Sequence, residues 1–130
     1  MTCARRMIPP LATALALLSG TTLAQDAYPE EAQLAFNNHC RTCHVTKEGD
    51  NRLGPSLHNI IGRKAGAAPG FGYSSAMKDA GITWDEETLD RYIENPEAVV
   101  PGNNMKPYTG ITSAEERAKI IAHLKADSGG

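Results

Sequence analysis

The chain has 130 residues, with 13 basic and 15 acidic side chains and a formal net charge of −2. This negative charge argues against nucleic acid and against anionic membrane surfaces as partners. The length suits one small domain, and four Tyr, two Phe and one Trp leave little large apolar material for a core. We therefore expect something besides side chains to fill the interior.

The first 24 residues have the pattern of a secretory signal peptide. Arg5 and Arg6 precede an apolar run at 11–18, and small residues follow it. That run is too short to span a bilayer, which takes roughly 20 apolar residues, and no later segment approaches this length. We predict a signal peptide at 1–24, an exported domain at 25–130 in the periplasm, and no membrane span in the mature chain. The alternative is an uncleaved membrane anchor.

The first predicted helix of the mature domain covers residues 29–38. Pro29 suits a first helical position, and Ala32 and Phe36 recur at helical spacing. The following segment, 45–73, is rich in Gly and Pro and is a predicted loop. A loop of this length in a compact domain needs a reason to be ordered.

Two further helices are predicted at 75–80 and 85–94, the second with acidic residues in its first turn. Segment 99–111 is again a predicted loop. The last helix begins at Thr112 or Ser113, because each is followed three positions later by a glutamate, as in a capping box. No strand pattern persists, so the predicted fold class is all-α.

The motif Cys-Arg-Thr-Cys-His occupies residues 40–44, and the third cysteine, Cys3, lies in the signal peptide. Two thiols at this spacing can form a redox disulfide, half of a zinc site or a haem attachment. Zinc needs a second pair of ligands, and no closely spaced pair of the usual kind occurs. A thioredoxin-like disulfide needs a βαβ context, which is missing. The pattern favours haem, with Cys40 and Cys43 joined to its vinyl groups and His44 beneath the iron.

A haem would fill the thin core and order the long loops. The candidates for its sixth ligand are the two methionines that remain after cleavage, Met77 and Met105, and the free histidines at positions 39, 58 and 123. His39 is too close in sequence to cross to the other haem face. Met77 lies in a short helical turn, where packing is the expected role. Met105 lies in a loop between Pro101 and Pro107 that can pass over the ring, so we predict it as the distal ligand. The alternative is that Met105 is ordinary core packing.

More motifs follow in a fixed order: Gly54-Pro-Ser-Leu-His58, Gly62-Arg-Lys-Ala-Gly66, Gly81-Ile-Thr-Trp84, Tyr92-Ile-Glu-Asn-Pro96 and Pro101-Gly-Asn-Asn-Met105. Together with the cysteine motif they resemble the class I c-type cytochromes, a family that includes mitochondrial cytochrome c and bacterial periplasmic relatives. The resemblance covers nearly all of residues 30–125. It implies one small all-α domain whose terminal helices cross and whose loops wrap around one covalently bound haem c.

The resemblance also implies roles for individual residues. The carbonyl of Pro55 would accept a hydrogen bond from His44 and so fix the imidazole. Arg63, Tyr73 and Trp84 would contact a haem propionate. Without the resemblance, Arg63 would be read as a solvated loop charge and Trp84 as a core residue.

On the distal side, Tyr92 would hydrogen-bond near the sulfur of Met105, and Asn103 is included among the haem contacts. Without the resemblance, Tyr92 belongs to the core face of its helix. Where the terminal helices cross, small and aromatic residues of the first helix would pack on apolar residues of the last, namely Ala32 and Phe36 on Ile120 and Leu124.

The chain departs from the family pattern around the distal ligand. Asn103 and Asn104 stand where family members often carry Thr or Lys. Pro107 replaces an aromatic residue in a segment one residue longer than usual, and Tyr108 is expected to take the aromatic's place. Met77 replaces an asparagine near the propionates. Most lysines of the family's docking ring are missing, so the mitochondrial partners do not carry over.

The resemblance implies a soluble periplasmic one-electron carrier rather than an enzyme. It would work as a monomer between redox protein partners, such as membrane oxidase or reductase complexes of a respiratory chain or a periplasmic dehydrogenase. One alternative is a tightly bound haem subunit of such a dehydrogenase. Another is a peroxidase-like or gas-binding haem protein in which Met105 leaves the iron.

Overall fold

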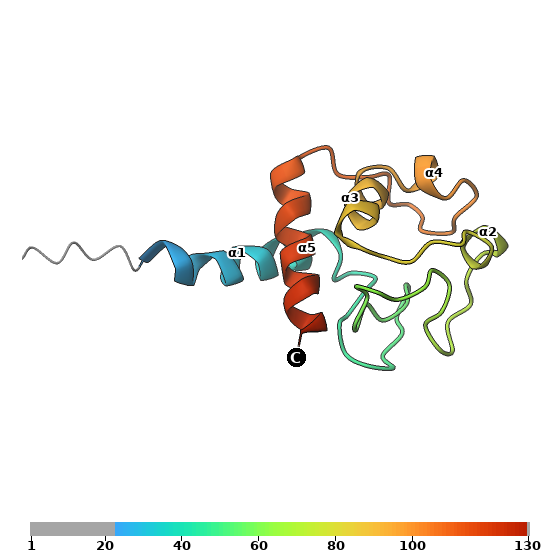
Figure 1. Ribbon diagram of the computed structural model, residues 1–130, viewed down its shortest axis with the longest axis horizontal. Coiled ribbons are helices and arrows are strands. Elements are labelled where there is room, and N and C mark those ends of the chain that lie inside the picture. Colours follow the sequence, from blue (N-terminus) through green and yellow to red (C-terminus); the bar gives the residue numbers. More distant parts are fainter. Residues whose placement is uncertain (1–22, 130) are drawn as a thin grey trace, which may run out of the picture.

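The computed structural model describes residues 23–129. Within this range the chain forms five helices, α1 (Leu23–His39), α2 (Ser75–Lys78), α3 (Glu86–Glu94), α4 (Pro96–Val99) and α5 (Ala114–Ser128), joined by long loops (Figure 1). The part described contains no strand, only an isolated bridge between Lys64 and Thr83. The all-α prediction is therefore confirmed.

Most of the predicted signal peptide, residues 1–22, lies outside the described residues. The domain boundary after residue 24 accordingly stays a prediction. Among the helices of residues 23–129, none has the length and apolar character that a membrane crossing would require.

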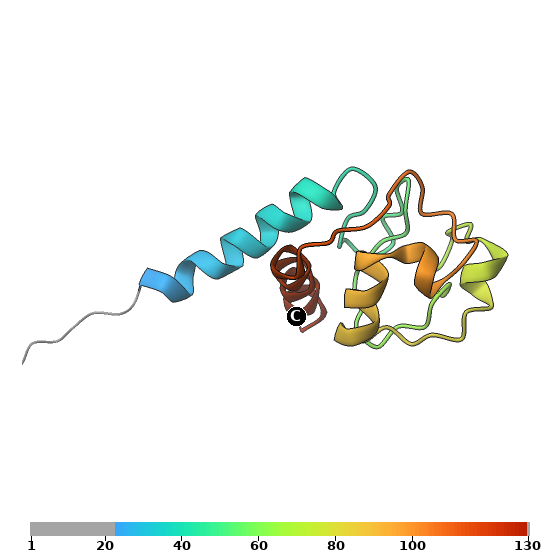
Figure 2. The same ribbon diagram turned by 90° about the horizontal axis from the view of Figure 1, so that it is seen from above.

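Helices α1 and α5 cross at one end of the domain (Figures 1 and 2). The prediction that the first helix begins at Pro29 was wrong, because α1 begins at Leu23 and Pro29 lies inside it. Good helix formers before the proline allow the earlier start. The crossing buries Phe36 of α1 together with Ile120 and Leu124 of α5, the last two 0% and 2% exposed. Close approach of the two backbones depends on small residues, and Ala32 is likewise buried.

Helix α3 has the start and end that the sequence predicts. Asp85 is the N-cap and accepts a hydrogen bond from Thr88 N at 2.7 Å, while Thr88 Oγ1 accepts one from Asp85 N at 2.9 Å. Three residues of the predicted apolar face, Leu89, Tyr92 and Ile93, are buried. The helix carries one side of the core.

The short helix α4 was not predicted. Asn95 caps it by accepting a hydrogen bond from Ala98 N at 3.2 Å, and Pro96 occupies the first helical turn. A proline that ends one helix also suits the start of the next, since its missing N–H has no helical partner there. Helix α2 is shorter than predicted, because Asp79 already forms its C-cap.

Of the two starts that the sequence allows for the last helix, the chain uses Ser113, whose Oγ accepts a hydrogen bond from Glu116 N at 3.3 Å. Arg117 of α5 is buried and donates to Asp90 of α3 at 2.7 Å. It also donates to the carbonyl of Ile111 at 3.0 Å. This side chain ties α5 to α3 and to the loop before α5.

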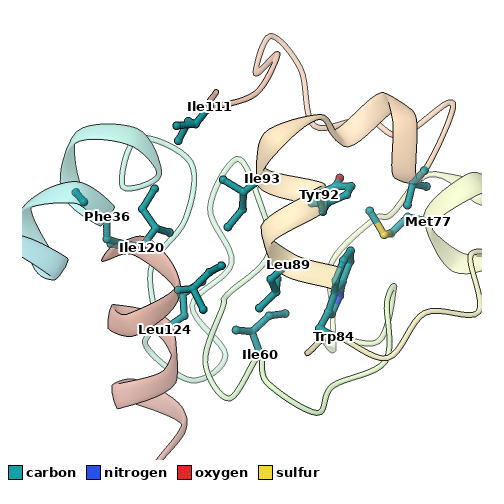
Figure 3. Close-up of a cluster of buried hydrophobic side chains, with 13 residues drawn as sticks. Phe36, Ile60, Met77, Trp84, Leu89, Tyr92, Ile93, Ile111, Ile120 and Leu124 are labelled. Atoms are coloured by element: carbon teal, nitrogen blue, oxygen red, sulfur yellow. The ribbon is translucent and has the colours of Figure 1, made fainter. Parts of the chain in front are cut away.

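The core lies between these helices and the long loop 45–73 (Figure 3). Its α1–α5 end is packed with aliphatic side chains. At the other end, Tyr92 projects from α3 toward Met77 of α2, with Trp84 alongside. The candidate site must be sought at this second end, where aromatic and polar side chains meet.

Candidate haem site

The cysteine motif follows α1 without a break. Cys43 N and His44 N both donate to the carbonyl of Cys40, at 3.0 and 2.9 Å, so the motif forms one tight turn. Both thiols are half-buried and free. Burial, with Cys43 nearby, raises the pKa of the Cys40 thiol to about 12. The turn thus brings two thiols and an imidazole close together in the chain, with Cys40 packed against the core.

His44 is only 7% exposed, and its ring has a fixed orientation. Nδ1 lies 2.8 Å from the carbonyl oxygen of Pro55. Because a carbonyl only accepts, Nδ1 carries the proton and Nε2 keeps its lone pair. Burial lowers the pKa of His44, which favours the neutral ring. A neutral imidazole held through one nitrogen is the form that binds a metal through the other, and the expected contact with Pro55 is present.

Gly54 lies directly against the His44 ring, a contact that sequence reasoning missed. A Cβ at this position would lie 2.2 Å from His44 Cε1, far inside van der Waals contact. The backbone is pinned there by the bond from Gly54 N to the carbonyl of Cys43, at 2.8 Å. The sequence feature that could have revealed this contact is the glycine immediately before Pro55. Gly54 needs no special backbone angle, but its position has no room for a side chain.

Arg63 and Trp84 are brought together by two backbone hydrogen bonds. Trp84 N donates to the carbonyl of Arg63 at 2.9 Å, and Gly62 N donates to the carbonyl of Trp84 at 2.7 Å. The half-buried guanidinium donates to the carbonyls of Ser56 and His58, at 2.8 and 2.9 Å. Among the described residues it makes no ion pair with a carboxylate, and burial lowers its pKa. Such a cation suits an anionic group on a ligand.

Tyr73 contributes to the same region from the end of the long loop. Its hydroxyl accepts a hydrogen bond from Ala68 N at 3.1 Å. Its ring packs edge-on against Phe71, with centroids 4.9 Å apart. Tyr73 packs against the core cluster that contains Trp84, and Trp84 is hydrogen-bonded to Arg63 through the backbone, so the three predicted propionate contacts lie on segments that meet.

Tyr92 carries an unsatisfied buried hydroxyl. Its ring lies 5.0 Å from that of Trp84, and its Oη has no hydrogen-bond partner in the described part of the chain. Burial raises the pKa of Tyr92 to about 12, so the group stays a neutral phenol. A buried donor without a partner costs stability and indicates a group that the protein chain itself does not supply.

Met105 is half-buried and packs against the core. Its backbone N donates to Asn103 Oδ1 at 2.9 Å, and Asn103 Nδ2 donates to the carbonyl of Val100 at 3.0 Å. Asn103, predicted among the cofactor contacts, thus organises the Met105 loop through bonds to the chain. Met77 is buried in the core, as expected of a packing residue, and Tyr108 turns inward, its hydroxyl donating to the carbonyl of Ile93.

These residues fit a flat, largely apolar cofactor that contains iron and carries acidic substituents. The oriented imidazole of His44 suits the metal. The guanidinium of Arg63, which has no carboxylate partner among the described residues, suits the acidic groups. The phenol of Tyr92, whose hydroxyl has no partner there, suits the buried side of the cofactor. A closed zinc site would instead need several clustered ligands. Residues 23–129 hold no group of three or more His, Cys, Asp and Glu side chains arranged for a metal ion.

Comparisons with known proteins agree with this geometry. A family model described as Cytochrome c matches residues 29–127. Cytochrome c2 from Rhodomicrobium vannielii is 48% identical over 102 residues, which cover 78% of this chain and 80% of that protein. Cytochrome c type-1 from Ascaris suum is 42% identical over 98 residues, which cover 75% of this chain and 87% of that protein.

A solved structure of cytochrome cH from Methylobacterium extorquens superimposes with a TM-score of 0.69 at 35% identity. The match covers 75% of this chain and 97% of that one. The Cys40–His44 motif is the attachment sequence for one covalently bound haem c, and the relatives are electron carriers rather than enzymes. The chain therefore belongs to the cytochrome c family, as a class I c-type cytochrome that works in electron transfer.

Proposed function

We propose that this cytochrome is a soluble periplasmic one-electron carrier whose haem iron is bound by His44 and Met105. The observation that carries the proposal is the state of His44. Its Nδ1–H is engaged by Pro55 at 2.8 Å, which leaves Nε2 free and directed away from that carbonyl. A second ligand from the Met105 loop would complete the coordination of the iron.

When bound, the haem supplies the one-electron chemistry. The protein supplies fixed ligands, a low-dielectric surrounding and a docking surface. With His44 and Met105 both bound, no position is open to a substrate, and electron exchange requires little rearrangement. A thioether also favours the reduced iron and raises the reduction potential.

The remaining site residues bind and orient. Arg63, with Tyr73 and Trp84 beside it, would bind the propionates and offset their negative charge. Tyr92 would donate its unpartnered hydroxyl near the Met105 sulfur. Asn103 would set the course of the chain that delivers Met105, since it accepts the hydrogen bond from Met105 N.

The proposed partners are redox proteins that donate and accept single electrons. Membrane oxidase or reductase complexes and a periplasmic dehydrogenase are the candidate classes. The signal-peptide pattern of residues 1–24 supports export, and the relationship to cytochromes c2 and cH supports a carrier. We propose that the carrier is a monomer.

The test is a pair of methionine variants. Met105→Ala should abolish the methionine–iron charge-transfer band of the ferric protein, lower the reduction potential and admit azide. Met77→Ala is the matched control, because Met77 is the other methionine of the mature domain and is a buried core residue. It should keep the band even though it loses stability. A band that survives Met105→Ala but disappears in Met77→Ala would reverse the assignment.

Two further measurements separate the alternative functions. Gel filtration of a native extract should give the cytochrome at the size of a free small protein. Elution with a dehydrogenase would indicate a bound subunit instead. A high-spin ferrous protein that binds carbon monoxide readily would indicate a gas-binding or peroxidase-like role.

A further inference from the structure

The carboxylate of Glu97 contacts the Met105 loop on both sides of Met105. Oε1 accepts a hydrogen bond from Gly102 N at 2.9 Å. Oε2 accepts one from Asn103 Nδ2 at 3.2 Å and one from Lys106 Nζ at 3.0 Å.

The contacts start from a well-defined platform. Glu97 lies in the first turn of α4, which Asn95 caps at its N-terminus. Val100 N donates to the carbonyl of Pro96 at 2.9 Å, and Asn103 N donates to the carbonyl of Val100 at 3.1 Å. Helix α4 and the turn after it therefore form a continuous hydrogen-bonded unit from which Glu97 reaches back over the loop.

Asn103 links this unit to Met105 itself. It is 3% exposed, and both polar atoms of its amide are hydrogen-bonded. Nδ2 donates to Glu97 and to Val100, while Oδ1 accepts the hydrogen bond from Met105 N at 2.9 Å. A displacement of Glu97 would therefore disturb the Asn103 amide and, through it, the backbone of Met105.

We propose that Glu97 is a positioning residue that holds the Met105 sulfur over the haem iron by clamping Gly102, Asn103 and Lys106. The inference rests on the proposed function, in which Met105 is the distal ligand. The hydrogen bonds that Glu97 accepts come from Gly102, Asn103 and Lys106, so it would act on Met105 through the loop. Its removal should therefore shorten the time that the sulfur stays bound without changing which residue binds.

The contacts that Glu97 makes with Gly102, Asn103 and Lys106, here called the clamp, lie at the surface. This exposure limits how strongly they can slow the opening of the Met105 loop. The side chains of Glu97 and Lys106 are 54% and 58% exposed. Exposed ion pairs contribute little to stability, but a carboxylate that also binds a backbone N–H and a buried amide contributes more. We expect opening of the loop to be faster while the fold and the absorption spectrum stay intact.

The experiment measures imidazole binding to the ferric holoprotein, which requires the methionine to leave the iron first. Glu97→Gln keeps an oxygen for Gly102 N, but its amide nitrogen cannot accept from Asn103 or Lys106. It should bind imidazole about three- to tenfold faster than wild type, because the polar contacts that are lost lie at an exposed site where solvent weakens them. Lys106→Ala removes one contact and should have a smaller effect in the same direction.

Glu87→Gln is the matched control, because Glu87 is an exposed glutamate in the first turn of α3 and the change in charge is identical. It should bind imidazole at the wild-type rate. Equal rates in Glu97→Gln and Glu87→Gln would overturn the positioning role. The same variants should keep the charge-transfer band at neutral pH; loss of the band in Glu97→Gln would show a ligand exchange rather than a change in residence time, and would also overturn it.

Met105→Ala separates this inference from the function on which it rests. If Met105 is the ligand, that variant binds imidazole faster than every other variant. If it binds no faster than wild type, the ligand assignment fails, and the clamp fails with it. If Met105→Ala is fast but Glu97→Gln is not, only the clamp fails.

Discussion

The two sides of the candidate haem site are built differently. On the His44 side, the chain forms a tight turn with two attachment cysteines, and Gly54 and Pro55 pack directly on a buried imidazole. On the Met105 side, a half-buried side chain sits in a loop held by polar contacts from Asn103 and Glu97. One side is fixed by the two haem attachments and by steric fit, the other by hydrogen bonds, of which those from Gly102 and Lys106 to Glu97 lie at the surface.

This difference gives the two ligands different properties: one resists exchange, and the binding of the other can be adjusted. A close-packed ligand resists exchange, because moving it requires the backbone to move as well. A ligand on a loop held by surface hydrogen bonds can be tuned through residues that never touch the iron. Three of the residues expected to depart from the family pattern, Asn103, Pro107 and Tyr108, lie on the Met105 side.

The largest effect is expected from Gly54→Ala on the His44 side. The added Cβ would lie 2.2 Å from the imidazole, so the ring or the chain must move. Overpacking of this kind costs about 3 kcal/mol, which lowers the melting temperature by about 12 °C or more in a domain of this size. Thermal unfolding of the holoprotein and the yield of low-spin haem measure it.

Gly72→Ala is the control for this change. Nothing lies within 4 Å of the position of its Cβ, and its backbone angle is an ordinary one. It should melt close to wild type. Equal melting of the two variants would mean that the His44 side is as adaptable as the Met105 side.

A smaller effect is expected from Asn103→Ala on the Met105 side. The variant leaves Met105 N without its partner and removes one of the two hydrogen bonds to the Val100 carbonyl, at a position only 3% exposed. Loss of these bonds costs about 1–3 kcal/mol in unfolding free energy, measured by denaturant titration. The neighbouring Asn104 is exposed, and Asn104→Ala should cost almost nothing. A large loss in Asn104→Ala with none in Asn103→Ala would contradict the hydrogen-bond pattern.

The smallest effect is expected when acid protonates Glu97. The hydrogen bond from Gly102 N and the pairing with Lys106 hold the pKa of Glu97 below its ordinary value of 4.5. Because the pKa of Glu97 is lower in the folded protein, its contribution to holding the Met105 loop is fully present above pH 4.5. That contribution is lost as the pH falls through the lower pKa of the folded state. Tyr92, the other titratable group that interacts with it, stays neutral throughout this range.

Thermal loss of the charge-transfer band in wild type and Glu97→Gln, followed from neutral to acid pH, tests this point. Both proteins should keep the band at neutral pH; on heating there, the wild type should lose it at a higher temperature than Glu97→Gln, and this difference should vanish once Glu97 is protonated. A difference that stays constant from neutral to acid pH would show that the charge of Glu97 has no part in holding Met105.

Local patterns in the sequence predict much of this fold. The capping residues Asp85 and Ser113 mark the starts of α3 and α5, and the cysteine motif identifies the cofactor. These signals act over a few residues, so a single sequence contains them. The contact between His44 and Pro55 was expected only through the resemblance to a family.

The parts that were missed depend on geometry between distant or irregular segments. Gly54 reads as one more loop glycine until the chain is seen to cross the His44 ring. Glu97 reads as a surface charge, because its partners lie in a loop without periodicity. Helix α4 was missed because Pro96 was taken only as the end of α3, although the Asn95-Pro96 pair also caps and starts a helix.

The crossing of α1 and α5 also bears on the order in which the protein is made. Phe36 lies near the beginning of the domain, and its partners Ile120 and Leu124 lie near the end (Figure 3). Contacts between such distant positions form late, because closing a long loop costs entropy before the contact is gained. The attachment cysteines therefore emerge well before the helix that closes the core. Because α5 is the last element of the chain, the core cannot close at the α1–α5 crossing until the final residues of the domain are available.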